Sequence, residues 1–239
     1  MRRALLLALS LLAIPAVQAA DLQPFTASYT ADWKQLPMSG SAERSLVKDK
    51  EKDNVWTLNF KASMLVASLS EVSKLKLEKD QPVPLSYHFE RGGLGKVKNV
   101  DLNFNWKDMT VTGTDNKTPV TVKLLTGMLD KSTYQLALQR DVLAGKKSMS
   151  YQVVDGDEVD TYDFRVIGPE VVTTKAGKIN AIKVERVRDP AQNKRITEMW
   201  FAKQWDGLLV ALRQVEKDGK EYNIMLLDGT VDGKTVKGE

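Results

Sequence analysis

The sequence predicts a mainly β protein, a large curved antiparallel sheet or partly open barrel of meander topology with one helix inserted mid-chain. Apolar and polar residues alternate over many short runs, which is the pattern of half-buried strands. Turn residues such as Asp218-Gly219 separate these runs, and helical spacing is clear in one segment. Such a chain folds either as an all-β protein with a helical insert or as an α+β protein with a dominant antiparallel sheet.

The clearest hairpin pattern lies between Thr173 and Leu227. It begins with a turn at 173–177, and apolar residues then recur along four runs, Lys178–Arg188, Arg195–Ala202, Leu208–Val215 and Tyr222–Leu227. Lys217-Asp218-Gly219-Lys220 joins the last two runs, and Asp-Gly between apolar runs is the strongest short-range hairpin signal. Four strands joined by short turns therefore predict a meander that buries one face.

The preceding part of the chain extends the same sheet. Residues 25–33 alternate strictly, and Leu36–Gly40 forms a turn into a weaker strand at 41–50. Trp33, Trp56 and Trp106 continue the inward alternation and are expected in the core. Further strands are predicted at 56–62, 72–77, 83–89, 97–106, 109–112, 119–123, 149–154 and 159–167, while 64–69 fits either a strand or a helical turn.

One helix is predicted within residues 124–143, because apolar residues recur there at helical spacing. Asp130 or Ser132 can cap its start, Ser132-x-x-Gln135 fits a capping box, and Gly145 is a stop signal. Closure of the sheet into a barrel, or curling of the sheet around this helix, would protect the strand edges. Alternation alone does not decide between a helix that plugs the sheet and one that packs outside it.

Residues 1–19 have the features of a secretory signal peptide. Two arginines follow Met1, an apolar run extends from Ala4 to Ile14, and Val17-Gln18-Ala19 is a small-residue cleavage pattern. We expect residues 20–239 to form a single β-rich domain in a bacterial periplasm, with no lipid anchor and no integral membrane segment. Removal of the leader takes two arginines with it and lowers the net charge from +4 to about +2 (4 − 2).

Composition excludes several chemistries. The chain has no cysteine and one histidine, His88, which excludes thiol nucleophiles, disulfides and histidine-rich zinc sites. Ser86 shares a strand face with His88, but no elbow motif or acidic partner accompanies the pair, which favours two ordinary surface residues. The acidic cluster at 155–163 lacks EF-hand spacing and is typical of a solvated hairpin. We therefore expect no catalytic residue, metal or cofactor, and the interspersed charges argue against nucleic acid as a partner.

Two tryptophans are the best candidates for a ligand-binding surface. Trp200 departs from the apolar alternation of its run, and Trp205 lies in a Gln-Trp-Asp-Gly loop. Exposed aromatic rings at such positions can stack on sugars or contact an apolar ligand.

Several short motifs follow one another along nearly the whole mature chain. They are Phe25-x-Ala-x-Tyr29 to Leu36-Pro37-x-x-Gly40, Pro84-x-x-Tyr87, Asp130-x-Ser132-x-Tyr134, Thr174-x-Ala176-Gly177-x-Ile179, Met199-Trp200-Phe201, Leu208-Leu209-Val210 and Asp218-Gly219. In this order the motifs resemble the bacterial domain-of-unknown-function family 3108. One departure is Leu209, which stands where the family pattern has a proline. The resemblance implies a secreted, β-rich envelope protein and no particular reaction.

The leading functional hypothesis is a non-enzymatic binding or envelope-assembly protein that holds a lipid or other apolar ligand in the curved sheet. It follows from a dozen predicted strands rich in large apolar residues with one helix to cover them. The alternative is a glycan- or peptidoglycan-binding module that uses exposed Trp200 and Trp205, with an envelope glycan or protein as partner. A hydrolase with two facing carboxylates ranks third.

Overall fold

The computed structural model describes residues 22–33, 39–65, 67–93, 97–189, 191 and 194–239. The predicted signal peptide and most of the predicted turn at 36–40 lie outside these residues, as does the side chain of Trp33. The helical elements are α1 (Thr133–Leu143) and the short 3-10 helix η1 (Lys203–Trp205). The strands are β1 (Phe25–Trp33), β2 (Ser39–Lys48), β3 (Val55–Met64), β4 (Ala67–Glu78), β5 (Gln81–Gly93), β6 (Lys98–Asn105), β7 (Thr110–Asp115), β8 (Thr118–Lys123), β9 (Leu129–Asp130), β10 (Ser148–Asp155), β11 (Glu158–Thr174), β12 (Gly177–Val187), β13 (Ile196–Ala202), β14 (Leu208–Val215), β15 (Glu221–Val231) and β16 (Lys234–Thr235).

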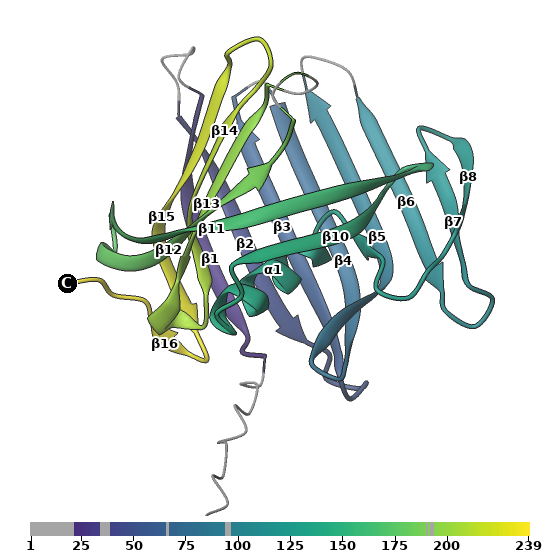
Figure 1. Cartoon of the computed structure of the whole chain (residues 1–239), viewed down its shortest axis with the longest axis horizontal. Coiled ribbons are helices and arrows are strands. Elements are labelled where there is room, and N and C mark those ends of the chain that lie inside the picture. Colours follow the sequence, from purple (N-terminus) through teal and green to yellow (C-terminus); the bar gives the residue numbers. More distant parts are fainter. Residues whose placement is uncertain (1–21, 34–38, 66, 94–96, 190, 192–193) are drawn as a thin grey trace, which may run out of the picture.

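The strands form one mostly antiparallel sheet that curls around α1 (Figure 1). Its order is β8-β7-β6-β5-β4-β3-β2-β1-β15-β14-β13-β12-β11-β10-β9, and β16 pairs with β15. The β9–β10 pair is parallel, and β1 pairs with β15 across most of the chain length. Within the described residues the end strands β8 and β9 do not pair with each other, so the sheet stays open. The predicted meander with one mid-chain helix is confirmed.

Alternation places the core on the inner face of the sheet. On β1, Phe25, Ala27 and Tyr29 are buried while the residue between the first two, Thr26, is exposed. Leu46 and Leu58 pair across β2 and β3 and are almost fully buried. Each such side chain contributes roughly 1.5–3 kcal/mol when it leaves water. Trp56, which is buried, and Trp106, which packs against the core, follow the predicted inward alternation.

The helix starts and stops at the residues that the sequence indicates, but its cap differs from the predicted box. The carboxylate of Asp130 accepts hydrogen bonds from the backbone N–H groups of Ser132 and Thr133, at 2.8 and 2.7 Å. Ser132 is the N-cap residue, but its hydroxyl makes no cap hydrogen bond. At the other end, the N–H groups of Gly145 and Lys146 bond back into the last turn, a Schellman motif that uses the left-handed Gly145.

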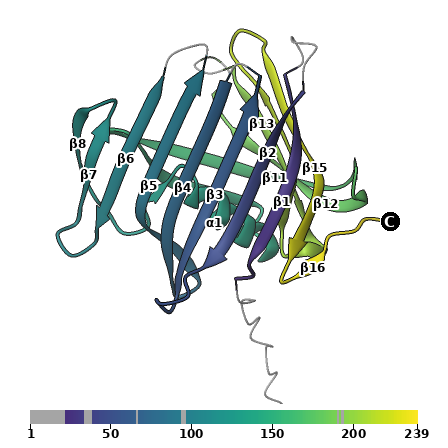
Figure 2. The same cartoon turned by 180° about the vertical axis from the view of Figure 1, so that it is seen from behind.

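α1 lies between the β1–β8 half of the sheet and β10–β11, as both views show (Figures 1 and 2). Leu136 belongs to an apolar cluster with residues of β1–β4 and β11–β15, whereas Leu138 belongs to one with residues of β10–β14. Near its C-terminal end the helix reaches turns at one end of the sheet, where Gln139 donates to the Asp206 carbonyl at 2.7 Å and Arg140 to the Asp80 carbonyl at 2.9 Å. The helix therefore plugs this end, and the opposite end, which we call the mouth, carries the β3–β4 and β14–β15 turns.

The structure extends or decides the sequence prediction at several elements. β11 runs on to Thr174, because a bulge at Ile167-Gly168 lets the strand bend and continue its pairing with β12. The ambiguous segment at 64–69 is strand on both sides of a turn, with β3 ending at Met64. The two-residue strands β9 and β16 are too short to leave a periodic signal in the sequence.

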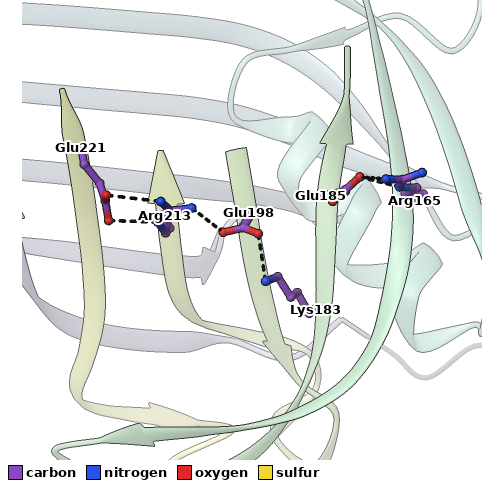
Figure 3. Close-up of polar contacts among 6 residues, drawn as sticks. All are labelled: Arg165, Lys183, Glu185, Glu198, Arg213 and Glu221. Carbon is purple, nitrogen blue, oxygen red and sulfur yellow. Dashed lines mark hydrogen bonds and ion pairs between the residues drawn. The ribbon is translucent and has the colours of Figure 1, made fainter. Parts of the chain in front are cut away.

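The outer face of the β11–β15 wall carries a ladder of ion pairs (Figure 3). Arg213 of β14 bonds to Glu198 of β13 at 3.0 Å and to Glu221 of β15 at 2.9 Å, and Lys183 of β12 contacts Glu198 at 2.9 Å. A further pair joins Arg165 to Glu185. These side chains alternate with inward residues such as Met199, which packs against the helix, so the ladder faces away from the interior.

Candidate functional site

A cavity of about 810 Å³ opens at the mouth of the curled sheet. Ala31, Ala62, Met64, Leu69 and Ile224 supply apolar lining from β1, β3, β4 and β15. Cavities of roughly 300–1,000 Å³ with mostly apolar walls are the usual size for small-molecule sites. The cavity is therefore large enough for an organic ligand.

Small side chains at inward positions make this space. Ala31 on β1 and Ala62 on β3 line the cavity. The next inward residue deeper on each strand is large, Tyr29 on β1 and Phe60 on β3. Gly40 pairs with Ala31, and a Cβ atom at this glycine would collide with the Ser63 carbonyl. The strands thus approach closely at the mouth, while their short inward side chains leave the interior open.

Charged residues surround the apolar lining. Arg195 forms an ion pair with Glu216 at 2.5 Å, and Lys220 pairs with Asp218 at 2.6 Å. The hairpin turn that carries two of these four residues is the Lys217–Lys220 turn predicted from sequence, with Gly219 at a φ of +82°. Arg91 lies across the cavity on β5. The lining therefore combines an apolar floor with polar groups near solvent.

A layer of buried polar groups lies deeper, beside the start of α1. The carboxylate of Asp130 accepts the Ser73 hydroxyl at 2.6 Å, and that of Glu71 accepts the Ser132 hydroxyl at 2.7 Å. Burial raises the pKa of both carboxyl groups, and the hydrogen bonds only partly oppose it. The Tyr29 hydroxyl donates to the Leu209 carbonyl at 2.8 Å, and burial raises its pKa to about 12 against the pull of the Arg44 charge.

The two tryptophans predicted as binding residues do not line the mouth cavity. The expected exposure of Trp200 is wrong, because the ring is 8% exposed between Ala211 on β14 and Lys183 on β12, whose ammonium lies 4.9 Å from the ring centre. Trp205 is partly buried in η1, in the β13–β14 connection at the plugged end, and donates to the Lys237 carbonyl at 3.2 Å. Their role in ligand binding stays a prediction.

His88 has an acidic partner that the sequence analysis did not foresee. Its Nδ1 lies 2.6 Å from the carboxylate of Asp101, directly opposite on β6. Ser86 is two positions away, but both members of the His88–Asp101 pair are substantially exposed and neither lines the mouth cavity. The geometry matches a surface hydrogen bond between neighbouring strands.

Among the described residues, no group of three or more His, Cys, Asp or Glu side chains could hold a metal ion. Asp155 of the acidic cluster pairs instead with Lys131 at 2.8 Å. No helix in the described part of the chain is long and apolar enough to cross a membrane.

Residues 28–226 match the family model described as "Protein of unknown function (DUF3108)". The chain belongs to this family. The DUF3108 match runs from β1 into β15, so it covers the curled sheet, the helix and most of the mouth. The resemblance seen in the short motifs is confirmed.

A solved structure with a similar fold is a β-barrel-like protein of domain of unknown function DUF1849 from Brucella abortus. The TM-score is 0.60 at 14% sequence identity, with 89% of this DUF3108 chain and 99% of that chain covered. At this identity the likeness shows the fold alone. A search of curated proteins gave no match.

Sequence reasoning missed the residues that shape the cavity. It followed the large apolar residues in each strand, whereas Ala31 and Ala62 matter because they are small. It also passed over Arg44, which lies between Ala42 and Leu46 on the inward face of β2. A charged residue in the apolar half of an alternating strand was the available signal.

Proposed function

We propose that this protein is a non-enzymatic binding or envelope-assembly protein that holds an apolar or lipid-like ligand in the mouth cavity. The observation that carries the proposal is the cavity of about 810 Å³ at the mouth, walled in part by the short apolar side chains of Ala31 on β1 and Ala62 on β3. An apolar ligand would cover wall that is otherwise exposed to water, and the burial of that apolar surface favours binding.

We place the protein in the periplasm on the strength of the leader pattern in residues 1–19. The glycan-binding alternative has less support, because Trp200 is enclosed by its neighbours and does not offer a stacking face. Trp205 alone would give a small surface for a sugar.

Native mass spectrometry of residues 20–239, purified from periplasm without detergent, tests the proposal. The expected result is a reproducible extra mass that solvent extraction removes. After extraction, the probe dodecanol should bind to the empty protein and measurably raise its melting temperature. A clean apo mass in every preparation, together with no binding of dodecanol, would contradict the proposal.

A cavity-filling variant tests whether the ligand binds in the mouth cavity. Ala62→Phe should weaken dodecanol binding roughly tenfold or more, equivalent to about 1.4 kcal/mol, because the ring occupies the space of the ligand. Thr112→Phe is the matched control, since it adds the same ring on the exposed face of β7. Equal loss of binding in both variants would place the ligand elsewhere.

A further inference from the structure

Arg44 is a buried cation whose terminal nitrogen atoms lack hydrogen-bond partners among the described residues. It is 3% exposed, and neither of its two Nη atoms has a hydrogen-bond partner within the described chain. Its guanidinium carbon lies 5.2 Å from the centre of the Phe25 ring, which offers only the weak attraction of an aromatic face. A full charge held this deeply in a protein is strongly unfavourable unless an opposite charge or hydrogen-bond acceptors accompany it.

Two more arginines face the interior from the opposite wall. Arg186 stacks on Tyr162, with its guanidinium carbon 3.3 Å from the ring centre, and its buried Nε has no hydrogen-bond partner. Arg188 donates to the Arg195 carbonyl and the Thr197 hydroxyl, both at 3.2 Å. Burial and the charges of Arg186 and Arg195 lower the pKa of Arg188 to about 10. Arg195 is paired with Glu216, but among the described residues no ion pair joins Arg186 or Arg188 to a carboxylate.

The helix start brings the two walls together. Tyr134, in the first turn of α1, stacks on Phe164 with ring centres 5.8 Å apart and meets Tyr162 edge-on at 5.0 Å. Burial raises its pKa, and the nearby charges of Arg186 and Arg188 oppose that rise. The Arg44 charge also lies near Tyr134, since both Tyr134 and Glu71 oppose the lowering of the Arg44 pKa by burial. The arginines therefore surround one region of the interior.

The acidic side chains of this region do not neutralise the arginines. Glu71 and Asp130 accept hydrogen bonds from hydroxyl and backbone groups near the helix start, and in the described chain no ion pair joins either of them to Arg44, Arg186 or Arg188. Both Nη atoms of Arg44 and the Nε atom of Arg186 thus have no acceptor among the described residues. An incoming oxyanion would supply acceptors.

This region connects to the mouth cavity. Thr197, which accepts from Arg188, lies opposite Gln214, and Gln214 lines the cavity. On β2, Arg44 is the next inward side chain below Ala42, whose neighbour Ala62 also lines the cavity. A ligand seated in the cavity could therefore extend one end toward the arginines.

We propose that Arg44, Arg186 and Arg188 bind the oxyanion head group, a carboxylate or a phosphate, of an acyl-chain ligand whose tail occupies the mouth cavity. The inference rests on the proposed function and adds the head-group class. Guanidinium groups suit this role because they remain charged when buried and donate paired hydrogen bonds to carboxylate and phosphate oxygens.

Calorimetric titration with three ligands of one chain length tests the head group: dodecanoate, dodecyl phosphate and dodecanol. We expect the two anions to bind roughly 10- to 100-fold more tightly than the alcohol, as for hydrogen bonds to a charged group. The stronger of the two anions identifies the head group. Equal affinity of all three would overturn the inference and leave the proposed function standing, whereas no binding of any would count against both.

Variants separate recognition from support of the fold. Arg44→Met should remove the preference for the anions, keep dodecanol affinity and raise the melting temperature of the ligand-free protein, because it removes an unpaired buried charge. Arg186→Met gives a second, independent loss of the preference. Arg213→Met, in the outer ladder, is the matched control and should keep the preference intact. A lowered melting temperature with an unchanged preference in both inner variants would mean that these arginines are structural.

Discussion

Arginine side chains have different partners on the two faces of the curled sheet. On the outer face, Arg213 has a carboxylate on each side, and Arg165 is paired with Glu185. On the inner face, Arg44 and Arg186 are more deeply placed and yet have nitrogen atoms without partners. The outer arginines thus have carboxylate partners, whereas Arg44 and Arg186 contact aromatic rings and keep nitrogen atoms without an acceptor in the described chain. The outer arginines therefore stabilise the sheet, whereas the inner arginines are the ones that we propose bind the oxyanion of a ligand.

The carboxyl groups of the two faces also differ, because their pKa values are shifted in opposite directions. Burial would raise the pKa of Glu198 in the outer ladder, but the hydrogen bonds of Lys183 and Arg213 lower it overall. The pKa of Glu71 inside is raised, because burial outweighs its hydrogen bond from Ser132. The outer carboxylate is therefore stabilised as an anion, and the inner carboxyl group is stabilised as an acid.

The largest expected effect comes from Trp200, the apolar side chain beside the outer ladder. Trp200→Ala should lower the free energy of unfolding by about 3–5 kcal/mol, because it leaves a cavity between Lys183 and Ala211. Denaturant titration measures this loss, with Trp205→Ala, at the partly buried η1 position, expected to cost less. Unchanged stability of Trp200→Ala with lost retention on polysaccharide would instead support a glycan-binding face.

A smaller effect should follow from breaking the centre of the ladder. Glu198→Gln should cost about 1–2 kcal/mol at neutral pH, because Lys183 and Arg213 lose their shared anion. Because the pKa of Glu198 is lowered in the folded state, its stabilising effect is fully present above the ordinary glutamate pKa of 4.5. The effect is lost as the pH falls through the folded-state pKa. Arg165→Gln, which removes an exposed pair, should cost less than about 1 kcal/mol. Equal losses in both variants would show that the ladder is not a network.

The smallest effect on stability, an increase instead of a loss, is expected for Glu71 in the interior. Below the ordinary pKa of 4.5, Glu71 is protonated in the folded and unfolded states, so Glu71→Gln should leave stability unchanged there. As pH rises toward the raised folded pKa, only the unfolded state releases its proton, and wild-type stability falls. The variant lacks this loss and should be the more stable protein at neutral pH. Lys131 and Arg44 favour the Glu71 anion and Asp130 opposes it, so a less stable variant at neutral pH would show that the two cations prevail.

The sequence predicted the sheet more fully than the site. Alternation located β1, β14 and the inward aromatic residues, because a half-buried strand repeats every two residues whatever its partner. It could not predict that Lys183 lies across from Trp200, since that contact depends on cross-strand register. The bulge before Gly168 likewise shifts register through a pairing that the local sequence does not specify. The site residues were harder still, because they are defined by missing volume and missing partners.

The pairing of β1 with β15 also governs the order in which the chain can fold. Phe25 pairs with Val231, which is 206 positions later (231 − 25), and sheets with such distant pairings form slowly. Until β15 is in place, β1 presents a row of unpaired backbone groups, the kind of strand edge that recruits other chains into aggregates. A chain that ended before Glu221 would keep this edge open permanently. Solubility of the N-terminal half thus depends on residues near the other end of the chain.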